Sequence, residues 1–334
     1  MFDLSKVIAA SRTLLAMTII FGFLAIVPAH AQNPDRPPTP VTGFNPDKAE
    51  VHADEFKGGG PLVGHIVIPD QKAASLIQDN GRTWRDYRRG PLLWFVVATV
   101  PGVLVLLLLF RLIRGRVMID GGLAHRLITR FGSFERFMHW LTAFSWLILA
   151  LSGLNEIVGR RVLLPLVGNE MFTTLSTAGK YAHNFVAFPF MIGVVLMFFV
   201  WVRHNLPEMR DIDWFAQGGG LIGAGRPSAG KFNAGQKMVF WIVVLGGTGL
   251  SLTGLAMLFP FSVTDIAGMQ LISVVHGGIA LLMIAAMLGH IYIGTVGMEG
   301  AVEAMTTGDV DLNWAREHHD LWVEEVTAKS HPAE

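Results

Sequence analysis

The sequence contains no cysteine among its 334 residues, and this absence excludes several kinds of site. A chain without cysteine forms no disulfide, holds no thiolate-ligated iron–sulfur cluster and attaches no c-type haem covalently. Any redox metal that this chain binds must therefore use histidine or methionine side chains.

Charge is also scarce. Only 16% of the residues are Asp, Glu, Lys or Arg, and the formal net charge is zero. This balance argues against nucleic acid as a partner, because a phosphate backbone requires a basic face. Hydrophobic residues make up 51% of the chain, with 22 Phe and 9 Trp, a composition typical of a membrane protein.

Residues 1–31 predict a secretory signal peptide. A basic start precedes an apolar run from Leu14 to Val27, and Ala-His-Ala follows before the predicted cleavage. The alternative is an uncleaved anchor, although the run is shorter than the ~20 residues that a membrane span needs. Residues 32–90 are polar and rich in Pro, Gly and Asp, which predicts a periplasmic arm with little core of its own.

Five apolar segments are each long enough to cross a bilayer, which predicts an all-α membrane protein. We interpret residues 91–116 as an extra transmembrane helix, 120–298 as a four-helix bundle and 299–334 as a cytoplasmic tail. No internal repeat at a fixed period is evident. The predicted spans are Leu92–Leu112, Phe137–Val158, Phe185–Val202, Met238–Phe259 and Leu271–Val296.

Positive charges orient these spans. Three arginines, the last of them Arg116, close the first span and place that end in the cytoplasm. Alternation then places the 159–182 loop in the periplasm and the 203–237 loop, with its several Lys and Arg residues, in the cytoplasm. The sequence therefore predicts a multi-pass protein of a bacterial inner membrane with a periplasmic N-terminal arm and lipid around its spans.

Four histidines lie in or at the edge of the apolar spans, where ionisable side chains are costly and mark candidate functional sites. His139 lies near the cytoplasmic start of its span, and His183 lies at the periplasmic start of the next. His276 and His290 share the last span, on almost the same helix face and ~21 Å apart along the axis. Depth therefore pairs His183 with His276 and His139 with His290.

Two bis-histidine sites stacked across a four-helix bundle suit haem. A neutral imidazole on each side of the iron supplies both axial ligands without burying a net side-chain charge. Zinc is less suitable, because two histidines per site leave too few protein ligands. The alternative for any single histidine is a hydrogen bond between helices. We predict two b-type haems, with His183 and His276 as ligands of one iron and His139 and His290 of the other.

Small residues near these histidines favour a bulky planar ligand, although ordinary helix packing explains them equally well. Gly277 and Gly278 follow one histidine of the last span and Gly289 precedes the other, while the fourth span contains VLGGTGLSLTG. Arg136 lies one turn before His139, where it can meet a haem propionate or act as an interfacial anchor.

Five segments carry a resemblance to a known family. The resemblance covers about residues 120–325, and the four histidines occur in the family's order. The segments are RFGSFERFMHWLTAFSWLILALSGL, KYAHNFVAFPF, KFNAGQKMVFW, the HGG…GHIYIG span and AMTTGDVDLNWAREHHDLW. Together they resemble the gamma subunit, the membrane cytochrome b subunit, of respiratory formate dehydrogenase, and the arm and extra span match its longer members.

The resemblance implies that the four histidines ligate two b haems in the pairing given above. Electrons would come from an iron–sulfur beta subunit, supplied by a molybdenum or tungsten alpha subunit that oxidises formate. The chain itself would then catalyse no formate oxidation. The family also implies a higher oligomer of the whole complex.

The resemblance further implies that a quinone substrate is reduced on the cytoplasmic side beside His290. Asn233, Gly235 and Gln236 match the loop that lines the family's pocket. Amide side chains can donate to a quinone carbonyl without adding charge, and glycine lets the backbone come close. The alternative is that the loop only caps the helix that follows it, with Asn233 as the boundary residue.

Other functions stay open on the sequence. One is a different dihaem cytochrome b, such as the membrane subunit of a nickel–iron hydrogenase or a b561-type electron carrier, although the Asn-Ala-Gly-Gln-Lys loop favours formate dehydrogenase. A more distant one is a transporter that uses histidines as proton relays.

The histidines of the C-terminal segment do not predict a metal site. His318 and His319 are adjacent, so on a helix they point about 100° apart and would not chelate one metal well. The residues from Val302 to Val326 predict a cytoplasmic amphipathic segment with Trp314 and Trp322 as anchors.

Overall fold

The predicted signal peptide and most of the predicted arm lie outside the part of the chain that the structure describes. Within the arm, strand β1 (Val63–His65) pairs antiparallel with β2 (Ser75–Ile77). The sequence did not predict this short ladder, nor that a helix begins at Trp84, inside the predicted arm. The computed structural model describes residues 63–65, 75–77, 84–88, 90–221, 225, 227–260 and 262–330.

Five helices in the described residues are long and apolar enough to cross a membrane, which confirms the predicted all-α membrane fold. Each predicted span overlaps one of them. Large apolar side chains such as Ile113 and Leu282 are exposed on their outer surfaces, where lipid replaces water. The helices cover Trp84–Arg114, Ser133–Val162, Leu164–His204, Ala234–Leu258 and Ile266–Gly297.

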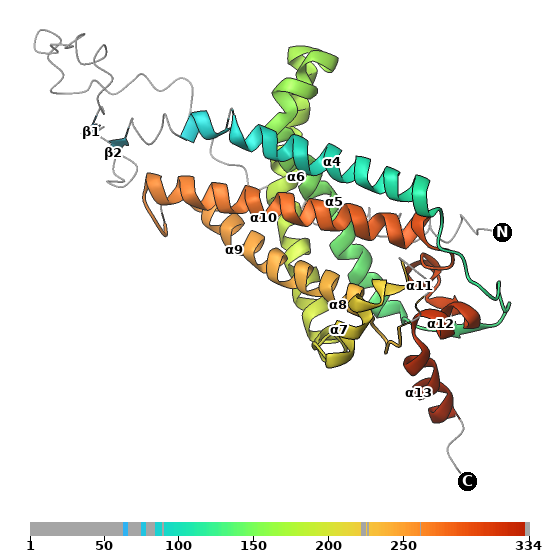
Figure 1. Ribbon diagram of the computed structural model, residues 1–334. Coiled ribbons are helices and arrows are strands. Elements are labelled where there is room, and N and C mark those ends of the chain that lie inside the picture. The colour runs from blue at the N-terminus through green and yellow to red at the C-terminus, as the bar shows by residue number, and fades with distance from the viewer. Residues whose placement is uncertain are drawn as a thin grey trace, which may run out of the picture.

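The long helices pack in two groups (Figure 1). Helix α10 (Ile266–Tyr292) lies between α4 (Pro91–Arg114) and α9 (Gly247–Leu258). Helix α5 (Ser133–Val162) runs along α6 (Leu164–Trp201), and α6 also contacts α9. Buried side chains from these helices form one hydrophobic core; they include Met138, Phe190, Val194, Val244 and Met283.

Glycines of the fourth span let its neighbours α6 and α10 approach it closely. A Cβ atom at Gly247 would lie 2.8 Å from Val194 on α6, and one at Gly246 would lie 2.8 Å from Met283 on α10. A Cβ at Gly249 would lie 2.9 Å from Ile279. These three glycines of the fourth span therefore serve helix packing, which was the alternative to a porphyrin contact.

The sequence predicted a loop at residues 159–182. This prediction is wrong, because two helices cover these residues in the structure. Helix α5 continues to Val162 and α6 begins at Leu164, with Gly168 (φ 78°, ψ 172°) as a non-helical residue inside it. After the kink at Gly168, the 33 residues from Asn169 to Trp201 form a helix about 50 Å long, against a hydrocarbon thickness of about 30 Å. Its first part projects past the other helices (Figure 1). Hydropathy detects only the part of a helix that contacts lipid, so this extension was missed.

The fourth spanning helix is continuous but changes its hydrogen-bond pattern. Helix α8 (Ala234–Trp241) continues through the short π-helix η4 (Ile242–Gly246) into α9. A second short π-helix, η5 (Ile293–Gly297), follows α10. Between α6 and α8, the chain forms η2 (Val202–His204), α7 (Met209–Ala216) and η3 (Gly218–Gly220).

The C-terminal tail folds onto the bundle as several short elements. They are α11 (Glu303–Thr306), β4 (Asp309–Asp311), α12 (Leu312–His318) and α13 (Asp320–Ser330). Strand β4 pairs antiparallel with β3 (Leu127–Thr129), which precedes α5.

The predicted amphipathic segment from Val302 to Val326 is therefore divided among several short elements, and the predicted anchoring role of its tryptophans is wrong. Trp314 and Trp322 are 2% and 5% exposed, so they pack inside the protein and do not lie on a membrane surface. A periodic apolar pattern cannot distinguish a helix on a membrane surface from a helix packed on the protein, because both bury one face.

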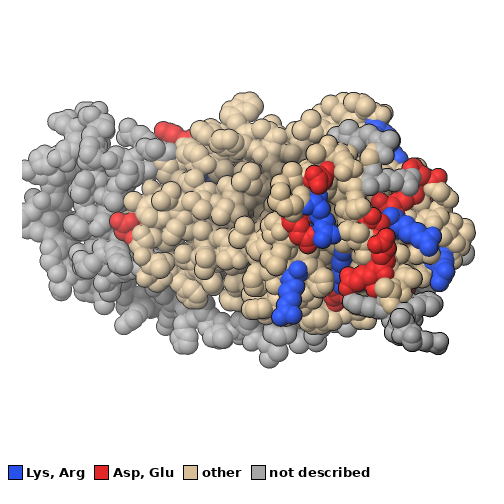
Figure 2. All heavy atoms as spheres, turned by 60° about the horizontal axis from the view of Figure 1, so that its bottom comes forward, with Lys and Arg blue, Asp and Glu red and all other residues tan. Residues whose placement is uncertain are grey.

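Charged side chains gather at one end of the face drawn in Figure 2, and the middle of that face is almost free of them.

Candidate cofactor site

The structure brings the four membrane histidines together in two pairs, the same pairs that their depth in the spans predicts. The ring centroids of His183 on α6 and His276 on α10 are 6.3 Å apart. Those of His139 on α5 and His290 on α10 are 6.2 Å apart. Helix α10 contributes one ring to each pair and so aligns both sites along a single helix.

The spacing in each pair fits a metal bound between two imidazoles. A metal–nitrogen bond of about 2 Å, plus about 1.1 Å from nitrogen to ring centre, separates two opposed ligand rings by about 6 Å. A direct hydrogen bond between the rings would place their centres about 5 Å apart. Among the described residues no group of three or more His, Cys, Asp or Glu could hold a metal ion. Two-histidine donor sets of this spacing suit haem iron.

A hydroxyl group orients each ring of the His183–His276 pair. Nδ1 of His183 lies 2.9 Å from Oγ of Ser152, and Nδ1 of His276 lies 2.8 Å from Oγ1 of Thr253. Each hydroxyl donates its single proton to a backbone carbonyl one turn earlier, at 2.6 Å in both cases. In the tautomer with the proton on Nδ1, the hydroxyl accepts from Nδ1–H, and the lone pair on Nε2 is free to bind a metal.

A glycine follows each of these hydroxyl residues and gives the ring its space. A Cβ atom at Gly153 would lie 3.5 Å from Cε1 of His183, and one at Gly254 would lie 3.5 Å from Cε1 of His276. The sequence analysis noted Gly254 only as part of a glycine-rich span and missed Ser152 and Thr253. Ser and Thr bonded to a carbonyl one turn back are common in helices, so the sequence carried no distinctive signal.

Other glycines beside the histidines have open surroundings. The Cβ positions of Gly277, Gly278 and Gly289 have no atom of a neighbouring segment within 4 Å. Their environment differs from that of the packing glycines on α9. The residues present on α10 therefore fit a wide, flat group next to the histidines.

The His139–His290 pair has different neighbours. Nδ1 of His139 is buried and makes no hydrogen bond within the described ranges. The next residue, Trp140, donates from Nε1 to the carbonyl of Met305 at 2.8 Å. Arg136 donates from Nη1 to the carbonyl of Thr306 at 2.7 Å. Arg136 thus attaches α11 of the tail to α5. This contact agrees better with an anchoring role for Arg136 than with a bond to a haem propionate.

The loop with Asn233, Gly235 and Gln236 forms the start of α8. The backbone N–H of Gln236 donates to Oδ1 of Asn233 at 3.0 Å, and the backbone N–H of Asn233 donates to Oε1 of Gln236 at 3.2 Å. This reciprocal capping box is the capping alternative from the sequence. It uses the two side-chain oxygens, and the two amide NH2 groups take no part in it.

Gly235 has a packing role in the structure. A Cβ atom there would lie 2.9 Å from Cη2 of Trp214 on α7, an indole that is 9% exposed. The close approach that the sequence analysis assigned to a quinone is thus made by a tryptophan ring. The indole of Trp214 therefore packs directly against the start of α8.

Arg130 holds the same loop, and the sequence analysis missed it. Its Nη2 donates to the carbonyl of Lys231 at 2.6 Å and to Oε1 of Gln236 at 3.1 Å. The guanidinium lies 4.9 Å from the ring centre of Phe131 and 5.2 Å from that of Trp314. Burial lowers the pKa of Arg130 to about 9, although the charge of Glu135 acts in the opposite direction.

The tail binds the chain just before this loop. Nδ1 of His319, which is fully buried, donates to the carbonyl of Gly230 at 2.8 Å. Burial, and then the charge of Arg130, hold the pKa of His319 well below its usual value. Asp320 accepts from Ser228 Oγ at 2.6 Å and from the N–H of Ala229 at 2.8 Å. Burial acts to raise the pKa of Asp320, but these hydrogen bonds outweigh it and lower the value.

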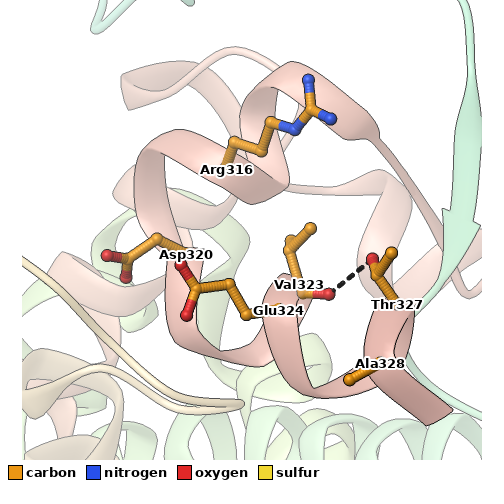
Figure 3. Close-up of a pocket in the computed structure, with 6 residues that line it drawn as sticks. All are labelled: Arg316, Asp320, Val323, Glu324, Thr327 and Ala328. Atoms are coloured by element: carbon orange, nitrogen blue, oxygen red, sulfur yellow. Dashed lines mark hydrogen bonds between the residues drawn. The ribbon is translucent and has the colours of Figure 1, made fainter. Parts of the chain in front are cut away.

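A shallow depression of about 610 Å³ lies on the tail between α12 and α13 (Figure 3). Asp320 on its rim is engaged with the loop before α8, and Thr327 donates to the carbonyl of Val323 at 2.7 Å. None of its lining residues is a histidine or an aromatic residue, so it does not extend the histidine sites. It is lined by Arg316, Asp320, Val323, Glu324, Thr327 and Ala328.

The sequence profile of the family named Prokaryotic cytochrome b561 matches residues 130–308, which include both histidine pairs. The chain belongs to the prokaryotic cytochrome b561 family. It is therefore a multi-pass membrane cytochrome b that binds b-type haem and carries electrons. The match begins after α4, so α4 is an addition to the part that the family profile covers.

Named relatives of this b561 cytochrome are formate dehydrogenase subunits. The cytochrome b556(Fdn) subunit of nitrate-inducible formate dehydrogenase from Escherichia coli K12 is 27% identical over 207 residues, which are 60% of this chain and 92% of the relative. The cytochrome b556(fdo) subunit from the same strain is 28% identical over 203 residues, 60% and 93% of the two chains. The Haemophilus influenzae formate dehydrogenase cytochrome b556 subunit is 32% identical over 149 residues, 40% and 62%. The resemblance stated from the sequence is confirmed.

Proposed function

We propose that this chain is the dihaem cytochrome b subunit that anchors a formate dehydrogenase in the bacterial inner membrane and passes its electrons to a quinone. The observation that carries the proposal is the presence of two histidine pairs, 6.3 and 6.2 Å between ring centres, in a bundle related to formate dehydrogenase cytochromes. Each haem, when bound, supplies reversible one-electron transfer at its iron.

In this proposal His183 and His276 hold one haem and His139 and His290 hold the other. Ser152 fixes the tautomer of His183 so that Nε2 carries the lone pair. The bundle keeps the two sites in one line, because α10 carries a ligand of each. No acid, base or nucleophile of this chain acts on formate in the proposal.

The proposal places the His183–His276 site toward the periplasm. Arg111 and Arg114 occupy the last turn of α4, and a basic helix end favours the cytoplasmic side. An iron–sulfur beta subunit would dock on the periplasmic side and deliver electrons from a molybdenum or tungsten alpha subunit. The projecting ends of α5 and α6 lie on that side and are available to such partners. Assembly of these complexes into a higher oligomer belongs to the same proposal.

The quinone site is proposed beside His290, at the start of α8. The capping box engages the oxygens of Asn233 and Gln236, so their NH2 groups are the donors left for a quinone carbonyl. Gly235 contributes indirectly, by admitting the Trp214 ring that walls the loop. Electron transfer toward this side and proton uptake from the cytoplasm would store energy of about 2.3 kcal/mol per charge per 100 mV.

One purification tests the proposal. The intact complex, isolated through a tag on this chain, should contain iron–sulfur and molybdenum or tungsten subunits by mass spectrometry. It should also contain two b haems per chain by pyridine haemochrome assay and reduce quinone with formate. A hydrogenase subunit in their place would favour the other dihaem class, and a spectrum without reducible b bands would leave only a non-haem role such as transport.

A further inference from the structure

We propose that Ser152 and Thr253 are positioning residues that lower the reduction potential of the His183–His276 haem below that of the His139–His290 haem. This proposal rests on the haem ligation in the proposed function, and it does not depend on formate, on quinone or on the partner subunits. The sequence analysis assigned neither residue a role.

The first step is the direction of the hydrogen bonds. A histidine that binds iron through Nε2 carries its proton on Nδ1, so in both cases Nδ1–H donates to a hydroxyl, and that hydroxyl donates to a carbonyl at 2.6 Å. A hydroxyl that donates is a better acceptor, because bonds in a chain polarise one another. A hydrogen-bonded Nδ1–H raises the basicity of the other ring nitrogen, which is the one that binds the metal.

The second step is the effect on iron. A more basic imidazole donates more electron density and stabilises ferric over ferrous iron, so the reduction potential falls. Both axial ligands of the His183–His276 site carry this bond. The effect therefore acts from both faces of the haem.

The two hydroxyls occupy equivalent places in two helices. Ser152 follows the N-cap residue Gly132 of α5 at the same spacing as Thr253 follows the N-cap residue Asn233 of α8. The surrounding sequences, LSGL and LTGL, also match, including the glycine against each histidine ring. The sequence shows no repeat at a fixed period, yet these two helices carry the same local pattern at the same distance from their N-caps. A matched pair of contacts argues against two accidental neighbours.

The other site lacks this arrangement on α5. Nδ1 of His139 is buried without a hydrogen-bond partner in the described part of the chain. A ligand without such a bond is the weaker electron donor. The difference in potential then drives electrons from the His183–His276 haem to the His139–His290 haem, which is the direction that the proposed function requires.

Redox titration of the purified haem-loaded chain tests this proposal, with dithionite and ferricyanide as reductant and oxidant. Thr253→Val removes one hydroxyl with little change of shape, and Ser152→Ala removes the other. Each should raise the potential of one haem by about 59 mV, which is a tenfold change for a one-electron couple. The second haem should titrate as in the unmodified chain.

Two control variants separate the hydrogen bond from simple packing. Thr253→Ser keeps the hydroxyl and should leave the potential unchanged. Ser251→Ala removes a hydroxyl on the same helix that bonds the carbonyl of Gly247 at 2.6 Å, and it should also have no effect.

Three results would overturn the proposal: no shift in Thr253→Val and Ser152→Ala, an equal shift in Ser251→Ala, or haem loss in place of a shift. A chain that binds no b haem at all would instead contradict the proposed function. The potentials are measured without formate or quinone, so a failure of the partner or quinone assignments leaves this test intact.

Discussion

The His183–His276 and His139–His290 pairs have nearly the same ring separation, 6.3 and 6.2 Å, in very different surroundings. At the first pair, two hydroxyls bond the histidine rings directly. At the second, the neighbouring side chains of α5 bond the backbone of the tail, and His139 Nδ1 stays unbonded among the described residues. The same ring separation is thus combined with two different neighbourhoods, one in which hydroxyls bond the histidine rings and one that attaches the bundle to its tail.

The strongest way to break this comparison is to remove one ligand from each pair. His183→Ala and His139→Ala should each lose one b haem, because a single remaining imidazole leaves one axial position without a protein ligand. The pyridine haemochrome assay should fall from two haems to one. His125→Asn is the control, since this histidine is exposed and asparagine tolerates its positive φ of 54°. Two haems retained in His183→Ala would contradict the pairing.

A second test concerns the loop that Arg130 holds. Arg130→Met should remove one of the two hydrogen bonds to Oε1 of Gln236, so that only the backbone N–H of Asn233 holds this oxygen and the NH2 group is positioned less firmly. We expect a KM for quinone about tenfold higher, about 1.4 kcal/mol, with both haem spectra unchanged. Arg126→Met is the matched control on an exposed arginine nearby.

Gln236→Glu sharpens this test. Glutamate keeps an oxygen for Arg130 and for the capping box, but it replaces the NH2 donor with an acceptor. The fold should remain while quinone binding weakens. An unchanged KM in this variant would move the quinone site away from Gln236, and loss of a haem would assign the loop a purely structural role.

Acid should weaken the tail at the His139–His290 end and leave the other end unaffected. The pKa of His319 is lowered by burial, so below its unfolded value of about 6.5 the unfolded tail binds a proton that the folded tail does not. Stability is therefore present above pH ~6.5 and falls as the pH decreases toward the folded pKa. Asp320, whose pKa is also lowered, adds a loss at more acidic pH. Protection factors of the α13 amides, measured from pH 7.5 to 5, report the loss that His319 causes.

His319→Gln provides the comparison variant for the acid test. Glutamine can still donate to Gly230 but does not titrate, so exchange in α13 should lose its dependence on pH near 6. Exchange in the first part of α6, at the far end of the bundle from the tail, should be the same in both proteins. A pH response of α13 that persists in His319→Gln would assign the acid sensitivity to another group.

The smallest effect is expected beyond the His183–His276 pair, where α5 and α6 extend together. Asn155→Ala should remove the bond from Nδ2 to Ser176 Oγ, 2.9 Å long, and cost about 0.5–1.5 kcal/mol. Thermal unfolding should shift slightly while haem content and potentials stay constant. Ser176→Ala should have a similar effect, and the double variant should be less than additive. Full additivity would mean that this bond contributes nothing.

The histidine pairing was predictable because it depends on depth alone. Apolar runs locate the spans, positive charges orient them, and the two histidines of the last span then lie at two levels. The extension of α6 was not predictable in the same way. The residues of its first part are polar enough to resemble a loop, although they are helical in the structure.

The contacts that act on the histidines were not predictable. Ser152, Thr253 and Arg130 are ordinary residues in the sequence, and each gains a role only from a partner far along the chain. The same holds for Asn233 and Gln236, whose side chains could cap a helix or face a ligand. The structure assigns their oxygens to the cap, and the proposed quinone contact depends on what remains.

The sequence by itself determined which segments enter the membrane, which histidines are available and, through the absence of cysteine, which cofactor chemistry is excluded. These follow from transfer of side chains into lipid and from donor chemistry, which are properties of single residues and short runs. Only the tertiary structure decided which hydroxyl meets which ring, which guanidinium holds the loop before α8, and that the tail tryptophans are buried. Those contacts depend on helices packing across long sequence separations, where one turn of rotation changes every partner.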